Sequence, residues 1–293
     1  MTIAAVVRSL RPRQWVKNLF VFAAVVFAEQ LFTPVAWRAI AAFAIFCGLS
    51  GAIYLLNDVA DREKDRLHPD KRRRPIAAGE LAPGVAVAVA AALVAGGLGA
   101  ALALGPRFAL TAAAYVALLV AYSACLKHVV IVDVLVVALG FVLRAVAGAV
   151  AVDAAISSWL LICTILLALF LALGKRRYEV LALENGGVPH RPILHEYSAP
   201  FLDQMIAVVT ASTVTAYALY TMSPETVAKF HTALLPLTLP FVLYGVFRYL
   251  YLLYHRELGG NPSELFLTDR PLLLNTVLWM AAVLVIIYGT RVR

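Results

Sequence analysis

The sequence contains little cysteine and little charge. Only three residues are cysteine, and Cys47, Cys125 and Cys163 all lie in apolar stretches without CxxC spacing. This pattern gives no sign of a disulfide or a zinc site and favours packing roles. Charged residues make up 14% of the chain and hydrophobic residues 62%, far outside the range of soluble globular domains. The net charge of +8 is therefore typical of basic loops beside a lipid surface, and not of a nucleic-acid-binding protein.

Long apolar runs separated by clumps of charge predict an all-α, polytopic membrane protein. Nine stretches are long enough to cross about 30 Å of hydrocarbon as helices. We expect them at 19–36, 37–56, 83–104, 107–126, 129–151, 156–174, 203–222, 232–254 and 271–290. Glu29 and Gln30 interrupt the first stretch, and Pro236 and Pro240 lie inside the eighth. We expect a single membrane domain that spans residues 1–293.

The distribution of basic residues predicts the orientation. Lysine and arginine gather before the first span and in the alternate loops at 57–82, 126–129, 175–202 and 255–270. These segments share one side of the membrane, which the positive-inside rule makes cytoplasmic. Residues 1–10 lack a signal-peptide cleavage pattern. We therefore expect a cytoplasmic N-terminus, with the polar loops facing the cytoplasm.

A cluster of oxygen-bearing side chains follows the second predicted span. If this segment is helical, Asn57, Asp58, Asp61 and Asp65 fall within an arc of about 100°, and Lys64 flanks that arc. Clustered carboxylates repel one another unless a cation lies among them, and hard oxygen ligands select magnesium held jointly with phosphates. The alternative is a solvated, charged helix end. The nearby membrane span and the basic run at 71–74 favour a site for magnesium and phosphates.

Charges inside spans are costly and usually mark a polar cavity. Arg144 lies in the middle of the fifth predicted span, and Asp133 lies eleven residues earlier on the same helical face. Arg144 either lines a cavity that attracts an anionic substrate or pairs with a neighbouring helix to hold the bundle together. Tyr122 and Lys127 end the preceding span, where the lysine is either a substrate ligand or an interface anchor.

A second polar cluster, Lys175, Arg176, Arg177 and Glu179, follows the sixth predicted span. Three consecutive cations are wider than one helix face, so at least one must point away from any pocket. They are either ordinary positive-inside residues or phosphate ligands that face the acidic site. The polar loop at 178–202 is long enough to cover a pocket, and its histidines lack metal-ligand spacing.

Several segments together resemble a known superfamily. The run 57–65, followed by His68-Pro69 and by 74–79, looks like the first acidic motif of the UbiA-type membrane prenyltransferases. The segments 11–18, 140–144 and 174–177 are similar to one branch of that superfamily, the decaprenyl-phosphate phosphoribosyltransferases. The resemblance covers nearly the whole chain. One departure supports the branch, because basic residues 175–177 stand where most aromatic prenyltransferases of the superfamily carry a second aspartate-rich motif.

The resemblance implies transfer of the 5-phosphoribosyl group from phosphoribosyl pyrophosphate to a polyprenyl (decaprenyl) phosphate, for the synthesis of a cell-wall arabinan precursor. The pyrophosphate would be held through Mg²⁺ by the acidic cluster, with Asp58, Asp61 and Asp65 as catalytic residues. The candidates for the 5-phosphate are Lys17, Lys64, Arg74, Lys127 and residues 175–177. Tyr122, Arg144 and Glu179 would complete the substrate-binding set. The resemblance also implies a bacterial plasma membrane as the location and an active-site cavity that opens to the cytoplasm.

Two alternatives stay open at this point. An aromatic prenyltransferase of quinone or haem biosynthesis would use the same acidic motif with a prenyl diphosphate as the electrophile. A transporter would use Arg144 and Asp133 to line a conduit. The charged clusters gather on one side and no inverted repeat of broken helices is evident, which argues against transport.

Overall fold

The structure is a computed structural model that describes residues 3–67, 71–184 and 192–289. Within these ranges the chain is helical and has no β-strand. It forms two compact units. Unit 1 comprises Met1–Val25, Phe32–Lys127 and Leu143–Ala155, and unit 2 comprises Val26–Leu31, His128–Val142 and Ile156–Arg293. Helix α7 (Val132–Ala151) contributes its first part to unit 2 and its last part to unit 1.

Eight helical stretches in the described ranges are long and apolar enough to cross a membrane. They are Ala36–Ala60, Pro83–Leu104, Pro106–Ala124, Val132–Ala151, Ser158–Glu184, Ala199–Met222, Leu235–His255 and Arg270–Gly289. Each corresponds to one of the nine predicted spans, which confirms the all-α membrane class. Two of these helices extend past the predicted ends and carry polar residues: α3 (Ala36–Ala60) includes Asn57 and Asp58, and α8 (Ser158–Glu184) includes residues 175–179.

The first predicted span, 19–36, does not form one long helix. The 3₁₀ helix η1 (Pro12–Phe20) leads into a short helix, α2 (Val21–Phe27), and turns follow up to residue 35. Glu29 has a left-handed backbone with φ 57°, a conformation that ends a right-handed helix. The polar pair Glu29 and Gln30 therefore coincides with the end of the helical segment.

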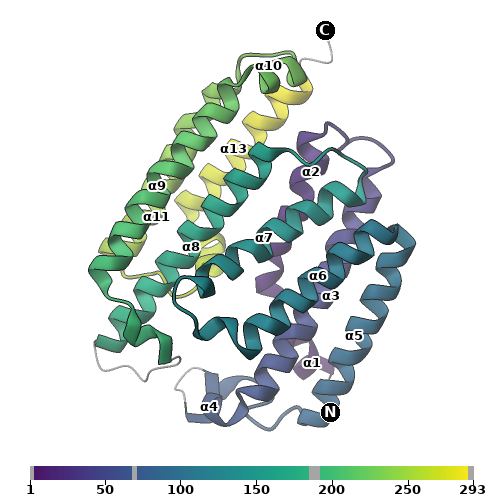
Figure 1. Cartoon of the computed structure of the whole chain (residues 1–293), viewed down its shortest axis with the longest axis vertical. Coiled ribbons are helices and arrows are strands. Elements are labelled where there is room, and N and C mark those ends of the chain that lie inside the picture. Colours follow the sequence, from purple (N-terminus) through teal and green to yellow (C-terminus); the bar gives the residue numbers. More distant parts are fainter. Residues whose placement is uncertain (1–2, 68–70, 185–191, 290–293) are drawn as a thin grey trace. The chain divides into compact units, whose positions relative to one another are not determined.

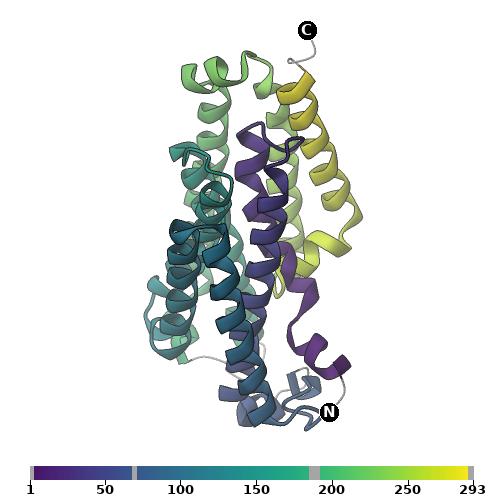
Figure 2. The same ribbon diagram turned by 90° about the vertical axis from the view of Figure 1, so that its right-hand side faces the viewer.

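Unit 1 is built around α3, which lies beside α5 (Pro83–Leu104), as Figure 1 and Figure 2 show. Gly105, with φ 127°, separates α5 from α6 (Pro106–Ala124), and proline begins both helices. Buried aromatic residues, among them Phe46 and Phe108, pack these helices against the second part of α7. Gly148 of α7 permits close contact with α2, since a Cβ there would lie 2.0 Å from the carbonyl oxygen of Val21.

The shorter elements of unit 1 precede or connect these helices. They are α1 (Ile3–Ser9), α4 (Arg62–Leu67) and η2 (Lys71–Arg73), and the chain passes from unit 1 to unit 2 within η3 (Leu126–His128). Ile76 and Leu81 are fully buried in a second apolar cluster with residues of α1, α3 and α5. This packing fixes the segment that follows η2 against the end of α3.

Unit 2 is held by α8, α9 (Ala199–Met222), α11 (Leu239–His255) and α13 (Arg270–Gly289), labelled in Figure 1. Its connecting elements are η4 (Pro192–Glu196), α10 (Pro224–Phe230), η5 (Leu235–Thr238) and α12 (Pro262–Thr268). The core contains the ring pair Phe170 and Tyr249, 5.0 Å apart between centroids. The Ser198 hydroxyl accepts from the backbone N–H of Phe201 and caps the start of α9.

An ion pair also fixes the start of α13. Arg248 of α11 donates two hydrogen bonds to the carboxylate of Asp269, of 3.2 Å from Nε and 2.8 Å from Nη2. The same carboxylate accepts the backbone N–H of Leu272 at 2.9 Å. These hydrogen bonds, chiefly those from Arg248, lower the pKa of Asp269 below its usual value.

Candidate functional site

The acidic segment of unit 1 keeps the helical spacing that the sequence predicts. Helix α3 ends at Ala60, Asp61 is its C-cap residue, and α4 begins at Arg62. The backbone hydrogen bonds nevertheless continue in steps of four, from the N–H of Asp61 to the carbonyl of Asn57 (2.9 Å) and from the N–H of Asp65 to the carbonyl of Asp61 (2.8 Å). The periodicity is therefore preserved across the junction between the two helices.

Two of the predicted carboxylates converge on a single cationic nitrogen. Nη1 of Arg74 lies 3.0 Å from Oδ1 of Asp58 and 2.6 Å from Oδ2 of Asp65. The side chains of both acids are almost completely buried, at 3% and 4% exposure, whereas that of Arg74 is 27% exposed. Arg11 forms a second ion pair with Asp58. Buried carboxylates need such compensation, because desolvation otherwise makes their charge very costly.

Local turns bring Arg74 to this position. Its backbone N–H donates to the carbonyl of Lys71, and its carbonyl accepts from Ala78 at 2.8 Å. Gly79, with φ 80°, ends this turn. Ile76 anchors the same segment in the core of unit 1. The predicted residues His68 and Pro69 of the motif lie outside the described residues.

The other members of the predicted acidic cluster are less enclosed. Asn57 and Asp61 are partly buried, and Lys64 is exposed. Within the described ranges, the Asp61 side chain makes no hydrogen bond or ion pair, and no three Asp, Glu, His or Cys side chains are grouped closely enough to hold a metal ion. The pair Asp58 and Asp65 still fits magnesium, which keeps several waters and is commonly bound through one or two carboxylates plus substrate phosphates.

Unit 1 also contains a group of three cations, Arg11, Lys17 and Arg144. Burial, followed by the positive charges of Arg144 and Arg11, lowers the pKa of Lys17 to about 8. Buried Arg144 donates from Nε to Oδ1 of Asn18 at 2.7 Å and from Nη2 to the hydroxyl of Tyr115 at 2.6 Å. Mutually repelling cations of this kind attract an anion. Arg11 pairs with Asp58, and the assignment of Lys17 and Arg144 to substrate phosphates stays a prediction.

Two further predicted residues end helix α6 and follow it. Tyr122 lies in the last turn of α6 and Lys127 in η3, and both are partly buried. Their positions agree with either a substrate ligand or an interface anchor, so their assignment to the substrate stays a prediction.

In unit 2 the cations of residues 175–177 diverge, as the width of the run predicts. Nε of Arg176 donates to Oδ2 of Asp133 at 2.6 Å, and the same arginine pairs with Glu179. Nε of Arg177 donates to Oδ1 of Asp203 at 2.6 Å. Lys175 lies 3.7 Å from Glu179 and is 43% exposed.

Tyr197 completes a buried network around Asp133. Its hydroxyl donates to Oδ1 of Asp133 at 2.7 Å and accepts the backbone N–H of Ile131 at 2.7 Å. Burial and the hydrogen bond to Asp133 raise the pKa of Tyr197, so the hydroxyl stays protonated and remains a donor. The network ties Tyr197, the residue after η4, to the start of α7. Of the histidines in this predicted loop, His195 is exposed and His190 lies outside the described residues.

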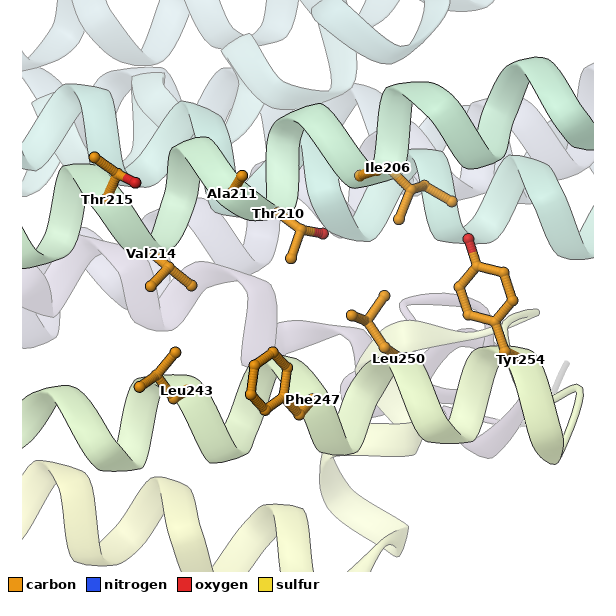
Figure 3. A pocket seen from close by; sticks show the side chains of 10 residues that line it. Ile206, Thr210, Ala211, Val214, Thr215, Leu243, Phe247, Leu250 and Tyr254 are labelled. Carbon is orange, nitrogen blue, oxygen red and sulfur yellow. The ribbon is translucent and has the colours of Figure 1, made fainter.

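A separate groove lies between α9 and α11 of unit 2. It has a volume of about 520 Å³ and is lined mainly by apolar side chains, as Figure 3 shows. Tyr254 lies at one end of the row of lining residues in this view, and Arg177 stacks on its ring at 4.1 Å. None of the predicted site residues lines the groove.

Several contacts of the predicted residues were not foreseen from the sequence. They involve Arg11, Asn18, Tyr115, Tyr197 and Asp203. Arg11 and Asn18 belong to the 11–18 segment that carried the resemblance, so that segment could have identified both as candidate site residues. Tyr115 and Tyr197 have no comparable sequence signal, because a single tyrosine in or near an apolar run is usually a packing or interface residue.

Comparison with known proteins relates this chain to membrane prenyltransferases. A model of the UbiA prenyltransferase family matches residues 18–269. The decaprenyl-phosphate phosphoribosyltransferase of Mycolicibacterium smegmatis is 32% identical, with 98% of this chain and 93% of the relative covered. The protein of the same name from Mycobacterium tuberculosis is 34% identical, with 96% and 93% covered.

A solved structure shares the fold. The structure of a UbiA homologue from Archaeoglobus fulgidus bound to DMAPP and Mg²⁺ is similar with a TM-score of 0.72. The match covers 97% of this chain and 99% of the homologue at 20% sequence identity. At that identity the similarity concerns the fold.

Proposed function

Because the chain belongs to the UbiA prenyltransferase family, we propose that it transfers the 5-phosphoribosyl group of phosphoribosyl pyrophosphate to a polyprenyl phosphate and releases pyrophosphate. The chain is an integral membrane transferase. The observation that carries the proposal is the arrangement in unit 1, where two buried carboxylates that converge on one cation occur together with Lys17, Arg11 and Arg144. The names of the mycobacterial relatives support phosphoribosyl pyrophosphate as donor and decaprenyl phosphate as acceptor.

The acidic residues are assigned to a divalent metal. Asp58 and Asp65 would hold Mg²⁺ together with Asn57 and Asp61, and the Mg²⁺ in the structure of the A. fulgidus homologue supports this cofactor. When bound, the ion would neutralise the charge that develops on the departing pyrophosphate.

The cations are assigned to phosphate groups. Guanidinium groups bind phosphate oxygens through paired hydrogen bonds, and ammonium groups bind them as point charges. Lys64, Arg74, Lys127 and the group Lys175, Arg176 and Arg177 remain candidates for the 5-phosphate together with Lys17. Arg144 and Tyr122 are assigned to the substrates, and Glu179 to the orientation of its neighbouring cations.

The reaction requires little proton chemistry from the protein. A phosphate oxygen of the lipid forms a bond to C1 of the ribose while the bond from C1 to the pyrophosphate oxygen breaks. The ribose gains oxocarbenium character as pyrophosphate leaves, so stabilising the leaving group is the largest contribution to catalysis. A phosphate monoester is already an anionic nucleophile near pH 7. No general base is needed at the lipid phosphate.

The membrane orientation belongs to the same proposal. The basic loops support a cytoplasmic N-terminus and a reaction on the cytoplasmic side, where a water-soluble donor is available. The lipid product would serve as the precursor of an arabinan donor for the cell wall.

The test compares two substrate pairs. Purified protein in detergent with Mg²⁺ is offered phosphoribosyl pyrophosphate with decaprenyl phosphate, or a prenyl diphosphate with an aromatic acid. We expect turnover of the first pair only. Turnover of the second pair alone would assign the chain to aromatic prenyl transfer. Turnover of neither pair would refute the proposed phosphoribosyl transfer.

A further inference from the structure

Arg74 occupies the position of a bound cation between the two carboxylates. One nitrogen of its guanidinium contacts both Asp58 and Asp65, at 3.0 Å and 2.6 Å. Both acid side chains are nearly inaccessible to water. Two buried anions so close together would repel strongly without a positive charge between them. Arg74 therefore supplies the charge compensation that a metal would otherwise provide.

Arg74 and a magnesium ion exclude each other at this position. Magnesium binds carboxylate oxygens at about 2.0–2.1 Å, whereas the Arg74 nitrogen already lies within hydrogen-bond distance of the same oxygens. Two positive centres at these distances from shared ligands would repel, and their coordination geometries would overlap. An ion that coordinates the two oxygens contacted by Arg74 therefore requires the guanidinium to leave them first.

We propose that Arg74 is an exchangeable internal cation that leaves Asp58 and Asp65 when a divalent metal binds, and then takes up a phosphate of the substrate. This inference rests on the proposed magnesium and pyrophosphate site and adds a mechanism that controls its occupancy. The side chain of Arg74 is 27% exposed, so it has access to solvent. A released guanidinium presents a fork of donors that matches phosphate oxygens.

The exchange couples the two ligands. Free Mg²⁺ has to break two charge-assisted hydrogen bonds of Arg74, so it binds weakly by itself. Pyrophosphate offers the released guanidinium a new anionic partner and thereby favours the same exchange. Metal and pyrophosphate consequently bind together, and the acidic pair stays neutralised in the resting protein.

The first test uses the unmodified protein. Arginines are labelled with phenylglyoxal in detergent micelles, and the modification of each residue is quantified by mass spectrometry in chelator, in Mg²⁺, and in Mg²⁺ with pyrophosphate. We expect Mg²⁺ alone, at the saturating concentration that the calorimetric titration below gives, to raise the labelling rate of Arg74 several-fold and pyrophosphate to lower it again. Arg73, exposed and adjacent, serves as the internal control and should not change. Labelling of Arg74 that Mg²⁺ leaves unchanged or reduces would overturn the proposal.

The second test measures Mg²⁺ affinity by titration calorimetry without any substrate. Loss of two charge-assisted hydrogen bonds predicts that Arg74→Met binds Mg²⁺ about tenfold or more tightly than the wild type. Arg73→Met removes the same charge from the same segment, and salt screening predicts a change within about twofold. An equal gain in Mg²⁺ affinity in both variants would indicate general repulsion between Mg²⁺ and nearby arginines, and it would contradict the exchange. Neither test contains phosphoribosyl pyrophosphate or polyprenyl phosphate, so failure here is distinct from failure of the transfer assay.

Discussion

Arg144 is held by Tyr115 in two ways: its Nη2 donates a 2.6 Å hydrogen bond to the tyrosine hydroxyl, and its guanidinium carbon lies 4.7 Å from the ring centroid. Its Nε donates to the side chain of Asn18, which is itself buried. These contacts fix the guanidinium of Arg144 inside unit 1 through a hydrogen bond to a hydroxyl, a hydrogen bond to an amide oxygen and a ring face.

Replacing Arg144 separates its two predicted roles. Arg144→Met keeps much of the volume but leaves the buried groups of Asn18 and Tyr115 without their donor, which costs about 1–3 kcal/mol of stability. If Arg144 serves the substrate, turnover or lipid-phosphate binding falls by a larger factor than this loss of folded protein explains. Tyr115→Phe is the matched control, because it removes the hydrogen bond and keeps both the charge and the ring. A destabilised Arg144→Met protein with normal activity per folded molecule would assign the arginine to bundle stability alone.

The acidic residues should be essential for turnover and dispensable for folding. Asp58→Ala, Asp61→Ala and Asp65→Ala should each lower kcat at least about hundredfold, since each removes a group that stabilises developing charge through the metal. Stability should change little, because removing a buried carboxylate also removes its desolvation cost and the partner Arg74 is partly exposed. Kinetics and thermal melting of the purified variants measure both quantities.

Glu63→Ala provides the control for the acidic series. Glu63 is exposed in the same helical segment, and its carboxylate pairs with Arg66. Removing this carboxylate should therefore leave kcat unchanged. Excess chelator should inactivate the wild type as completely as the aspartate substitutions do. Wild-type rates in chelator would remove the basis for the metal assignment.

The three cations of α8 should differ in their effect on stability. Arg176→Met strands the buried charge of Asp133 and should cost about 3–5 kcal/mol. Lys175→Met, at a partly exposed side chain 3.7 Å from Glu179, should cost less than about 1 kcal/mol. Chemical denaturation of each variant measures its loss of stability and so ranks the cations. The double variant Asp133→Asn with Arg176→Met should lose less stability than the sum of the single changes, and strict additivity would argue against the ion pair.

Phosphate binding by this group is tested separately from its stability. If Lys175 and Arg177 bind a phosphate of the donor, Lys175→Met and Arg177→Met should raise the KM for phosphoribosyl pyrophosphate more than they lower kcat. Unchanged kinetics in both variants would leave these residues with roles in topology and packing only.

The ion pair at Asp269 predicts a defined pH dependence. Its carboxyl has a lowered pKa in the folded protein, so its stabilising effect is complete above the unfolded value near 3.8 and is lost as the pH falls through the folded value. Asp269→Ala should therefore cost about 1–2 kcal/mol at pH 7 and progressively less below pH 3.8. Asp269→Ser keeps a capping oxygen for α13 and should show the loss of the ion pair alone. A cost that stays constant down to acid pH would contradict this account.

The membrane helices could be predicted because their determinant is local. Apolar length decides whether a helix can span hydrocarbon, and eight predicted spans correspond to long helices. The first span was wrong as a single helix, because the 16 residues of η1 and α2 end at Phe27 and the polar pair Glu29 and Gln30 follows. The helix ends were also misplaced where polar residues extend a helix, as at Asn57 and Glu179.

The candidate site was predictable in its residue types and not in its pairing. Spacing in steps of four placed Asn57, Asp61 and Asp65 on one helical face with Asp58 beside them, and backbone bonds keep that spacing from Asn57 to Asp65. The contact of Arg74 with two of these acids depends on a turn anchored by Ile76, which periodicity does not reveal. The substrate roles of the site residues stay predictions.

The most direct measurement follows two labels of phosphoribosyl pyrophosphate into the products. Purified protein, Mg²⁺ and decaprenyl phosphate are incubated with donor labelled either at the 5-phosphate or at the terminal pyrophosphate phosphorus. The proposed reaction predicts that the 5-phosphate label enters the lipid and that the pyrophosphate label stays entirely in water. Absence of the 5-phosphate label from the lipid, or entry of the pyrophosphate label, would contradict phosphoribosyl transfer.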